Sequence, residues 1–570
     1  MATELPRKQV AIVGVGWSGG IIASELAKEG YECIGLERGS ERKINDFIMQ
    51  KDELRYAIRY ELMQDLSKET LTFRNDQDML ALPMRQMGSF LLGTDLGGAG
   101  IHWNGQCPRF YPYDFEIRTQ TIDNYGEDRI PDDMPLQDWG ISYDDMEEYF
   151  AKFDETIGTS GEDNEMTAPR STEFPTPPMK QTRSMKMFAE AADSLGLHPY
   201  ISASANLSEA YTNPDGKTIN QCMYCSFCER FGCDYQAKSD PLITVIPTAL
   251  ETGNFEVRTH SNVREIAYDG NQTDGVYFTD TRTGEDYFQP ADVVILTSYV
   301  MNNTRLLLQS GIGDPYDPEN ETGVIGKNYC YQVMASAQGF FDEQFNLYAG
   351  AGALGGQVDD YNADNFDHSD LDFLHGGTIQ LTQTGIRPIA TNPVPPGTPT
   401  WGKEFKEASA HYFYRTLSLG SQGASLPYRY NYLDLDPTYT DSHGDPLLRM
   451  TYNFTEQDRN LAAHQSARLT EILEEMGANE VVSNPDIGDY NIMPYQTTHN
   501  TGGVIMGSDS ETSAVNNYLQ MWDCENLFVV GASAFPHNSG YNPTPTVGAL
   551  SYRAAEGILS YLEDPRPLAE

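Results

Sequence analysis

The chain has 570 residues, and 83 acidic against 38 basic residues give it a formal net charge of −45 and a pI of about 4.4. Because such a surface repels nucleic acid and anionic lipid, we exclude both as partners. The length exceeds a single ordinary core and predicts two or three domains, and 39% hydrophobic residues are typical of a globular protein.

Neither a membrane span nor a secretion signal is visible in the sequence. No stretch approaches the roughly 18 consecutive apolar residues that a transmembrane helix needs, so we expect no direct membrane insertion. The opening residues MATELPRKQV run directly into the first expected strand without a separate apolar region. We therefore expect no signal peptide of its own.

The first expected unit is a strand, a glycine-rich loop, a helix and a second strand between Val10 and Gly39. The loop carries the pattern G-x-G-x-x-G at Gly14, Gly16 and Gly19. The first glycine permits a tight turn, the second lets the backbone approach a pyrophosphate, and the third lets the helix lie close to the strand. Glu37, with Arg38 beside it, ends the second strand, where an acidic side chain can accept hydrogen bonds from ribose hydroxyls. The pattern predicts a dinucleotide site and does not choose between NAD and FAD.

Two segments of different character come next. From Asn45 to Leu80 the chain is charged, and apolar residues at helical spacing predict a helix packed on the sheet. Those residues are Leu54, Ile58, Leu62 and Leu66. From Gly88 to Phe115 the glycine content is high, which implies a backbone held against a large flat ligand or in turns with positive φ. The candidate contacts in this loop are Gly97, Gly98, His102, Trp103 and Asn104.

Four of the eight cysteines lie within twelve residues, at Cys222, Cys225, Cys228 and Cys233. Four thiolates this close in sequence can converge on one metal centre, and the first three spacings are those of iron–sulfur ferredoxins. A tetrahedral zinc site is the alternative, although zinc ligands usually come as two pairs separated by a longer loop. We expect an iron–sulfur cluster, and the spacing leaves open whether it is [3Fe–4S] or [4Fe–4S].

Regular elements are also expected in the second half of the chain. The segments FEVRTHSNVREIAYDG and TDGVYFTD predict alternating strands, ADVVILTS predicts a buried strand, and MNNTRLLLQSG predicts a helix that ends at Gly311. The stretch from Asn453 to Gly477 predicts an amphipathic helix, with Leu461, Leu469, Ile472 and Leu473 on its apolar side.

Near the C-terminus lie PYQTTHNTGGVIMG (494–507) and VVGASAFPHNSGYNPTPTVGAL (529–550). Together with the opening βαβ unit and the LGGAGIHWNG loop, they resemble the glucose–methanol–choline (GMC) flavoprotein oxidoreductases. Within that family, MPLQDWGISYDDMEEYFAKFDETIGTSG (134–161) is similar to the large flavoprotein subunits of bacterial gluconate, fructose and related sugar dehydrogenases. The resemblance runs from about residue 8 to about residue 562, and it implies FAD as the dinucleotide.

The resemblance also implies roles for individual residues. It makes His499 the base that removes a hydroxyl proton, for which an imidazole with a pKa near 6.5 is suited. Asn542 then holds the same substrate oxygen. The resemblance matches Val263 to a position where the family's backbone contacts the adenine ring. A valine in such a strand can equally be an ordinary core residue. His102 matches a histidine that is bonded covalently to the flavin in pyranose 2-oxidase, or it only packs near the ring. Further cofactor contacts are expected at Gly531, Ala532, Pro543 and Thr544.

The expected fold class is α/β (α+β), with a Rossmann-like FAD-binding domain and an interleaved substrate-binding domain built on a β-sheet with helices. We assign residues 1–131, 221–328 and 494–570 to three parts of the FAD-binding domain, the second carrying the cysteine segment and the third the catalytic pair. Residues 132–220 form a substrate or cap region, and residues 329–493 form the substrate-binding domain.

The function expected from the resemblance is oxidation of a hydroxyl of a sugar, sugar acid or polyol, with electrons leaving through the iron–sulfur cluster. The acceptor is then a quinone or cytochrome, reached through a partner that includes a small subunit. Export together with that subunit and a cytoplasmic location agree equally with the missing signal. Two alternatives remain open at this stage: an oxygen-using enzyme similar to pyranose oxidase, and a non-catalytic sensor that binds a nucleotide and zinc.

Overall fold

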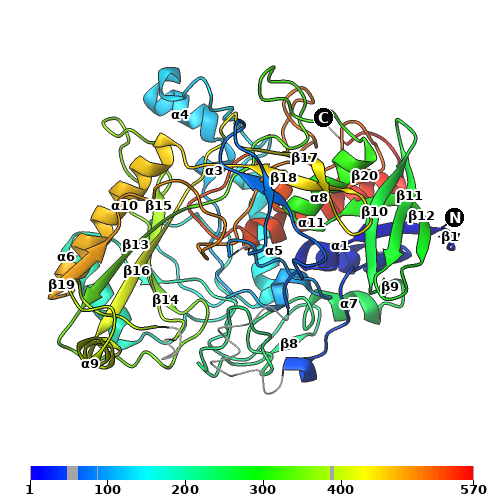
Figure 1. The fold of residues 1–570 in the computed structure, drawn as a ribbon. Helices are drawn as coiled ribbons and strands as arrows, with labels where there is room; N and C mark the ends of the chain where they lie inside the picture. Colours follow the sequence, from blue (N-terminus) through cyan, green and yellow to red (C-terminus); the bar gives the residue numbers. More distant parts are fainter. Residues whose placement is uncertain (1, 48–61, 87, 386–390, 569–570) are drawn as a thin grey trace.

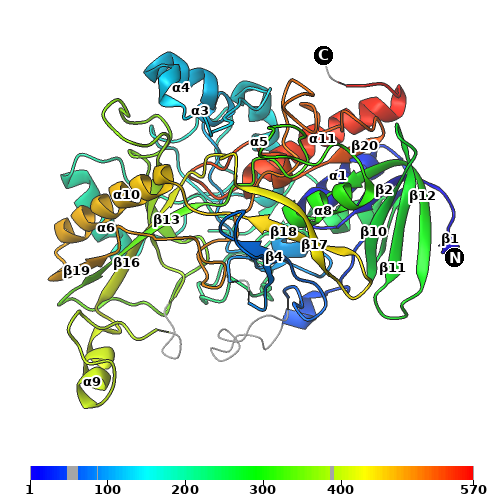
Figure 2. The same ribbon diagram turned by 45° about the horizontal axis from the view of Figure 1, so that its top comes forward.

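The computed structural model describes residues 2–47, 62–86, 88–385 and 391–568. Two large β-sheets lie at opposite ends of the molecule, and a smaller sheet lies between them (Figure 1 and Figure 2). We name the three after their central strands: the β2 sheet, the β16 sheet and the β18 sheet. The expected mixed α/β class is confirmed.

The β2 sheet has eight strands and contains both parallel and antiparallel pairs. Its main path is β10 (Ser261–Tyr268), β11 (Thr273–Asp280), β12 (Asp286–Leu296), β2 (Lys8–Val13), β3 (Cys33–Leu36) and β9 (Phe255–Arg258). The pairs β12–β2, β2–β3 and β3–β9 are parallel, and β1 (Thr3–Glu4) and β20 (Leu527–Val529) add to β12. Because Val10–Val13 of β2 and all of β3 are buried, these stretches contain no polar side chains, as is typical of parallel strands covered on both faces.

Helices cover this sheet. Helix α1 (Trp17–Lys28) follows β2 directly and packs against α7 (Val245–Glu251) and α11 (Thr544–Glu563), while α5 (Tyr143–Ile157) packs on α11. Helix α8 (Val300–Ser310) packs against β10 and ends at Gly311, whose φ of 66° lies in the left-handed region typical of a helix C-terminus. The strands and the helix predicted between residues 254 and 311 are therefore confirmed.

The β16 sheet is antiparallel throughout. Its order is β19 (Glu480–Ser483), β13 (Val333–Phe340), β16 (Thr416–Gly423), β15 (Gly377–Thr382), β14 (Gly355–Val358) and β6 (Tyr200–Ile201). Helix α10 (Glu456–Glu475) lies across one face and buries the four predicted apolar residues against it, and α6 (Arg183–Ser194) packs beside α10. The side chains of Thr455 and Asp458 form a capping box that fixes the start of α10.

The β18 sheet connects the N-terminal and C-terminal halves of the chain. It contains β17 (Tyr432–Thr440), β18 (Pro446–Thr451), β4 (Thr72–Arg74) and β5 (Leu82–Pro83). This arrangement corrects one expectation, because Leu62 and Leu66 lie in turns and not in a helix. Residues 72–74 instead gain hydrogen-bonded partners in β18, and Leu71 joins the core beneath them. Leu54 and Ile58 lie outside the described residues.

The remaining elements are short or peripheral. They are η1 (Ile44–Phe47), η2 (Gly98–Ile101), α3 (Pro112–Phe115), α4 (Ile117–Tyr125), η3 (Glu127–Arg129), β7 (Tyr211–Thr212), β8 (Thr218–Ile219), α9 (Lys403–Tyr412) and η4 (Ala532–Ala534). Helix α9 projects from the far end of the β16 sheet (Figure 2). Within the described residues, no helix combines the length and apolar character needed to cross a membrane.

Candidate active site

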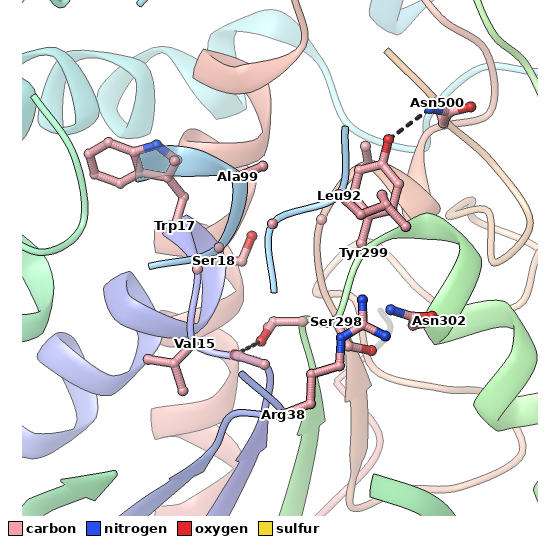
Figure 3. Close-up of a pocket in the computed structure, with 18 of the residues that line it drawn as sticks. Val15, Trp17, Ser18, Arg38, Leu92, Ala99, Ser298, Tyr299, Asn302 and Asn500 are labelled. Carbon is pink, nitrogen blue, oxygen red and sulfur yellow. Dashed lines mark hydrogen bonds between the residues drawn. The ribbon is translucent and has the colours of Figure 1, made fainter. Parts of the chain in front are cut away.

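A long cavity runs from the end of β3 across the first turn of α1 to the start of α11. Figure 3 shows its middle, with Val15 and Ser18 on one side, and with Ser298, just before α8, and Asn302 of α8 on the other. Most residues expected to contact a cofactor line this cavity: Gly14, Gly16, Glu37, Arg38, Gly98, His102, Trp103, Asn104, Val263, Gly531, Ala532, Asn542, Pro543 and Thr544. His499 lines it as well. Gly19 and Gly97 lie just outside the lining.

The glycine loop shows why two of its positions exclude a side chain. Gly14 has a φ of +89°, and a Cβ there would lie 3.0 Å from the backbone of Thr297 and Ser298. At Gly19 a Cβ would lie 2.2 Å from the carbonyl oxygen of Gly14. The third glycine therefore acts outside the cavity, since it allows α1 to approach the loop after β2 closely.

Glu37 is buried at the end of β3 and faces the cavity. Its two carboxylate oxygens accept hydrogen bonds from the backbone N–H groups of Val15 (3.1 Å) and Gly39 (3.0 Å). Burial raises the pKa of this carboxyl group. The two amides hold the side chain so that further lone pairs of its oxygens are available to a ligand.

The loop after Gly98 forms the other end of the cavity. His102 is buried, and its Nε2 atom has no hydrogen-bond partner among the described residues. Burial is the main reason why the pKa of His102 is lowered to about 3, so the ring is neutral. Trp103 is held by its indole nitrogen, which donates to the carbonyl of Ser239 (2.9 Å).

The cysteine segment lies directly behind this loop. The Lys238 ammonium group is buried and donates to the carbonyls of Trp103 (2.6 Å), Cys228 (2.9 Å) and Phe231 (2.9 Å). The backbone N–H of Arg230 donates to the carbonyl of His102 (2.7 Å). These contacts join the two segments, and Glu229 reaches the cavity itself.

The four cysteines do not form the expected metal centre in this structure. Within the described ranges, no three Cys, His, Asp or Glu side chains gather as a set of metal ligands. Burial raises the pKa of Cys222 to about 11 and that of Cys228 to about 12.

His499 and Asn542 meet at the end of the cavity next to the His102 loop. The Asn542 side-chain nitrogen lies 3.0 Å from His499 Nε2, and the Asn542 Oδ1 atom is buried without a partner. Burial lowers the pKa of His499 to about 3, and no charged neighbour contributes to that shift. A ligand in the cavity would therefore meet a neutral imidazole and an amide at this end.

Two buried carboxylates anchor the segment Ser539–Asn542. Asp114 accepts hydrogen bonds from the Ser539 hydroxyl (2.9 Å) and from His375 Nε2 (2.8 Å). Asp359 accepts a hydrogen bond from the Tyr541 hydroxyl (2.7 Å). Because all these groups are buried, they fix the backbone from which Asn542 projects.

Several residues that line the cavity belong to no recognisable sequence motif. Tyr299 precedes α8 with a φ of 81°, which is uncommon for a residue other than glycine. Figure 3 shows its ring pointing toward Asn500, whose amide nitrogen donates to the Tyr299 hydroxyl (2.7 Å). Ser298, Asn302 and Arg305 line the same wall. A buried strand followed by a helix is so common that the sequence of its connecting loop carries no functional signal.

Two segments of the chain match the GMC oxidoreductase family, residues 139–334 and residues 427–551. The whole chain is also 40% identical to the gluconate 2-dehydrogenase flavoprotein of Pantoea cypripedii, with 100% of this chain and 96% of that protein covered. The chain belongs to the GMC oxidoreductase family. It is thus a flavoprotein oxidoreductase that acts on CH–OH groups, and FAD is its cofactor. The alternative of a non-catalytic sensor is set aside.

Other relatives of this GMC oxidoreductase differ in the substrates they are named for. The chain is 28% identical to the 2-methyl-1,2-propanediol dehydrogenase of Mycolicibacterium austroafricanum, covering 99% of this chain and 97% of that protein. It is 24% identical to the fructose dehydrogenase large subunit of Gluconobacter japonicus, covering 99% and 100%. The solved structure of a pyridoxine 4-oxidase from Mesorbium loti superposes with a TM-score of 0.61 at 16% identity, covering 97% and 99%, which shows the same fold.

Proposed function

We propose that this protein is a dehydrogenase that oxidises a hydroxyl group of a sugar, sugar acid or polyol. The observation that carries the proposal is the contact between His499 and Asn542 at the end of the cavity. Its similarity to a gluconate 2-dehydrogenase flavoprotein and to a fructose dehydrogenase large subunit supports this substrate class.

The residues of the cavity fit FAD. Glu37 would accept hydrogen bonds from the ribose, and the loop from Gly14 to Gly16, with the N-terminus of α1, would hold the pyrophosphate. Buried polar atoms without partners occur along the cavity, at Trp17 Nε1, His102 Nε2 and Asn542 Oδ1. Such atoms are costly unless a ligand satisfies them, which supports a polar ligand in this position.

The catalytic role of the pair follows from its chemistry. His499 Nε2 would take the hydroxyl proton of the substrate, since a neutral imidazole can accept one. Asn542 would donate to the same oxygen and hold the carbon in place. Bound FAD supplies the acceptor for the hydrogen that leaves that carbon with two electrons. Asn104 and Gln106 line the same end of the cavity and offer amides to further hydroxyls.

The start of α11 lies beside the pair. Pro543, Thr544 and Val547 line the cavity where the first backbone N–H groups of the helix have no partners within the helix. The partial positive charge of this helix end would favour negative charge on the bound cofactor. Gly531 and Ala532 line the opposite side.

A covalent bond between His102 and FAD stays a proposal. It is supported by the unpartnered Nε2 atom of a neutral ring in the cavity. Denaturation of the protein in trichloroacetic acid tests the bond: yellow colour retained in the pellet would support it. Release of all the colour into the supernatant would rule it out.

We derive no electron-transfer step through the cysteine segment, because its side chains do not form a ligand set. Determination of iron and acid-labile sulfide in protein purified without oxygen tests whether the cysteines hold a cluster. Several iron and sulfide ions per chain would restore the iron–sulfur cluster as the route by which electrons leave.

We also propose that a partner takes the electrons. The support is the similarity to a dehydrogenase large subunit, which implies a smaller subunit, and a quinone or cytochrome would be the final acceptor. Under this proposal the protein is exported together with that subunit and acts outside the cytoplasm. A cytoplasmic location is the alternative.

The experiment that tests the function is a substrate screen with two readouts. Gluconate, fructose, glucose, sorbitol and a glucoside are supplied with an artificial electron acceptor under nitrogen, and peroxide formation is measured in air without that acceptor. We expect acceptor reduction with at least one compound and little peroxide. Rapid peroxide formation would instead identify an oxygen-using oxidase, and no turnover with any of them would refute the substrate class.

A further inference from the structure

Gln332 connects the two members of the catalytic pair. It lies directly before β13 and is completely buried. Its side-chain oxygen contacts His499 Nδ1, and its side-chain nitrogen donates to the backbone carbonyls of Ser539 (3.2 Å) and Tyr541 (3.4 Å). One amide thus touches both the imidazole and the segment that carries Asn542.

The two carbonyls fix the orientation of this amide. Carbonyl oxygens only accept hydrogen bonds, so the NH₂ group of Gln332 must face Ser539 and Tyr541. Its oxygen must then face His499 Nδ1. Since that oxygen cannot donate, Nδ1 must carry a proton.

The contact on the opposite side of the ring agrees with this tautomer. The Asn542 nitrogen lies 3.0 Å from His499 Nε2 and can only donate. In the neutral ring, Nε2 therefore carries the lone pair and Nδ1 the proton. The lone pair lies on the side of the ring where Asn542 and the cavity are found.

The backbone around Gln332 is held in register with that around His499. Cys330 and Thr501 exchange two backbone hydrogen bonds of 3.0 Å, and the Tyr331 hydroxyl donates to the carbonyl of Thr497 (2.7 Å). The Asn538 amide nitrogen donates to the carbonyl of His499 (3.1 Å). The position of Gln332 opposite the imidazole is thus built into the fold.

We propose that Gln332 is a positioning residue that keeps the proton of the His499 ring on Nδ1 and thereby presents Nε2 as the base. This inference rests on the proposed function, in which Nε2 accepts the substrate proton. The other tautomer would place an N–H group toward the substrate hydroxyl and could not accept its proton.

Because the Gln332 side chain is a neutral amide, it places no charge beside Nδ1 of His499. A carboxylate in the same place would stabilise the protonated imidazole, which cannot act as a base. His499 makes its ring contacts with the neutral groups of Gln332 and Asn542. Titratable side chains that line the cavity near the pair include His102, Glu229, Tyr299 and Tyr495. Replacement by glutamate therefore adds a charge next to Nδ1.

Three variants test the proposal. Gln332→Glu preserves the size but adds the charge, and Gln332→Met removes both hydrogen-bonding functions. Gln465→Met is the matched control, because Gln465 is equally buried and donates to the carbonyls of Tyr361 (3.2 Å) and Gly377 (3.3 Å) without touching the pair.

The first readout is independent of turnover. Imidazole ¹⁵N NMR of the FAD-loaded protein, with the His499 signals assigned by their loss in His499→Gln, should show the Nδ1–H tautomer in the wild type and in Gln465→Met. In Gln332→Met the population should move toward Nε2–H. An Nε2–H tautomer in the wild type would overturn the proposal even if the protein is an active dehydrogenase.

The second readout is the pH profile of kcat/KM. In Gln332→Glu the acid limb should move upward by about one pH unit or more, because the added carboxylate raises the pKa of the base. Gln332→Met should lose about 10²-fold in kcat with little change in KM. Unchanged profiles in both variants, with Nδ1–H retained, would also overturn the proposal. Absence of any oxidation by the wild type would refute the proposed function alone, since the NMR result stands without it.

Discussion

The side-chain nitrogen of Asn542 lies 3.0 Å from the Nε2 atom of His499, although 42 residues separate the two in the sequence. Both side chains border the cavity that we propose to hold FAD. The geometry brings a neutral base and a fixed hydrogen-bond donor to one point, as the oxidation of an alcohol requires.

Loss of the Asn542 amide should slow the chemical step without removing FAD. We expect Asn542→Ala to lower the rate of substrate oxidation by about 10²-fold, because the substrate oxygen loses the group that orients it. Flavin absorbance per chain and the melting temperature serve as controls for cofactor loading and folding. A rate within a factor of two of the wild type would exclude Asn542 from the mechanism.

A methyl group at Gly19 should be poorly tolerated. In Gly19→Ala the new Cβ would lie 2.2 Å from the Gly14 carbonyl oxygen, so α1 must move away from the glycine loop. We expect a loss of about 1–3 kcal/mol in the free energy of unfolding, together with weaker FAD binding. Gly420→Ala is the control, because a Cβ there meets only one atom, at 3.9 Å. Equal stability of the two variants in urea unfolding would contradict this prediction.

The ion pair between Arg305 and Asp441 should matter for cofactor binding. The two groups are 2.8 Å apart, largely buried, and line the end of the cavity where Glu37 lies. Arg305→Met leaves Asp441 without its cation, so we expect about tenfold weaker FAD binding and a lower melting temperature. Arg282→Met removes a cation that is 64% exposed and paired with Asp280, and it should change neither quantity measurably. FAD titration of the apoprotein by fluorescence measures both effects.

Stability should fall in mild acid because of the buried histidines. Folding lowers the pKa of His499 from 6.5 to about 3, so the unfolded chain binds a proton that the folded chain does not. The stabilisation is complete above the unfolded pKa and is lost as the pH falls from about 6.5 toward 3, with a slope of about 1.4 kcal/mol per pH unit. His499→Asn should therefore show a shallower decline between pH 6 and pH 4.5 than the wild type. The exchange of the exposed His443 for asparagine is the control, and parallel curves for the wild type and His499→Asn would refute the effect.

The sequence predicted much of the fold because periodicity and glycine spacing are local. The βαβ unit at Val10–Gly39, the strands and helix before Gly311, and the helix at Glu456–Glu475 all appear in the structure. Each depends on glycine spacing or on the pattern of apolar residues within one element. The helix predicted after Asn45 is wrong where the structure describes that segment. There, β4 pairs with β18, which lies more than 370 residues later in the chain and so leaves no local pattern in the sequence.

The candidate site was predictable only where a motif marks it. His499, Asn542 and the glycine loops carry such motifs, whereas Gln332 stands in YCYQVM with no pattern that suggests a role. Its importance comes from contacts with His499 and Tyr541, which lie 167 and 209 residues away. The opposite holds for the cysteine segment. Its sequence pattern is strong, but its side chains do not form a set of metal ligands among the described residues.

The central claim is that His499 accepts the proton while the substrate carbon is oxidised. The most direct test is to mix the FAD-loaded protein with its substrate in the absence of oxygen and follow the flavin absorbance. We predict rapid bleaching in the wild type, and in His499→Ala a rate lower by about 10²-fold or more at unchanged FAD content. Equally fast bleaching in His499→Ala would contradict the claim.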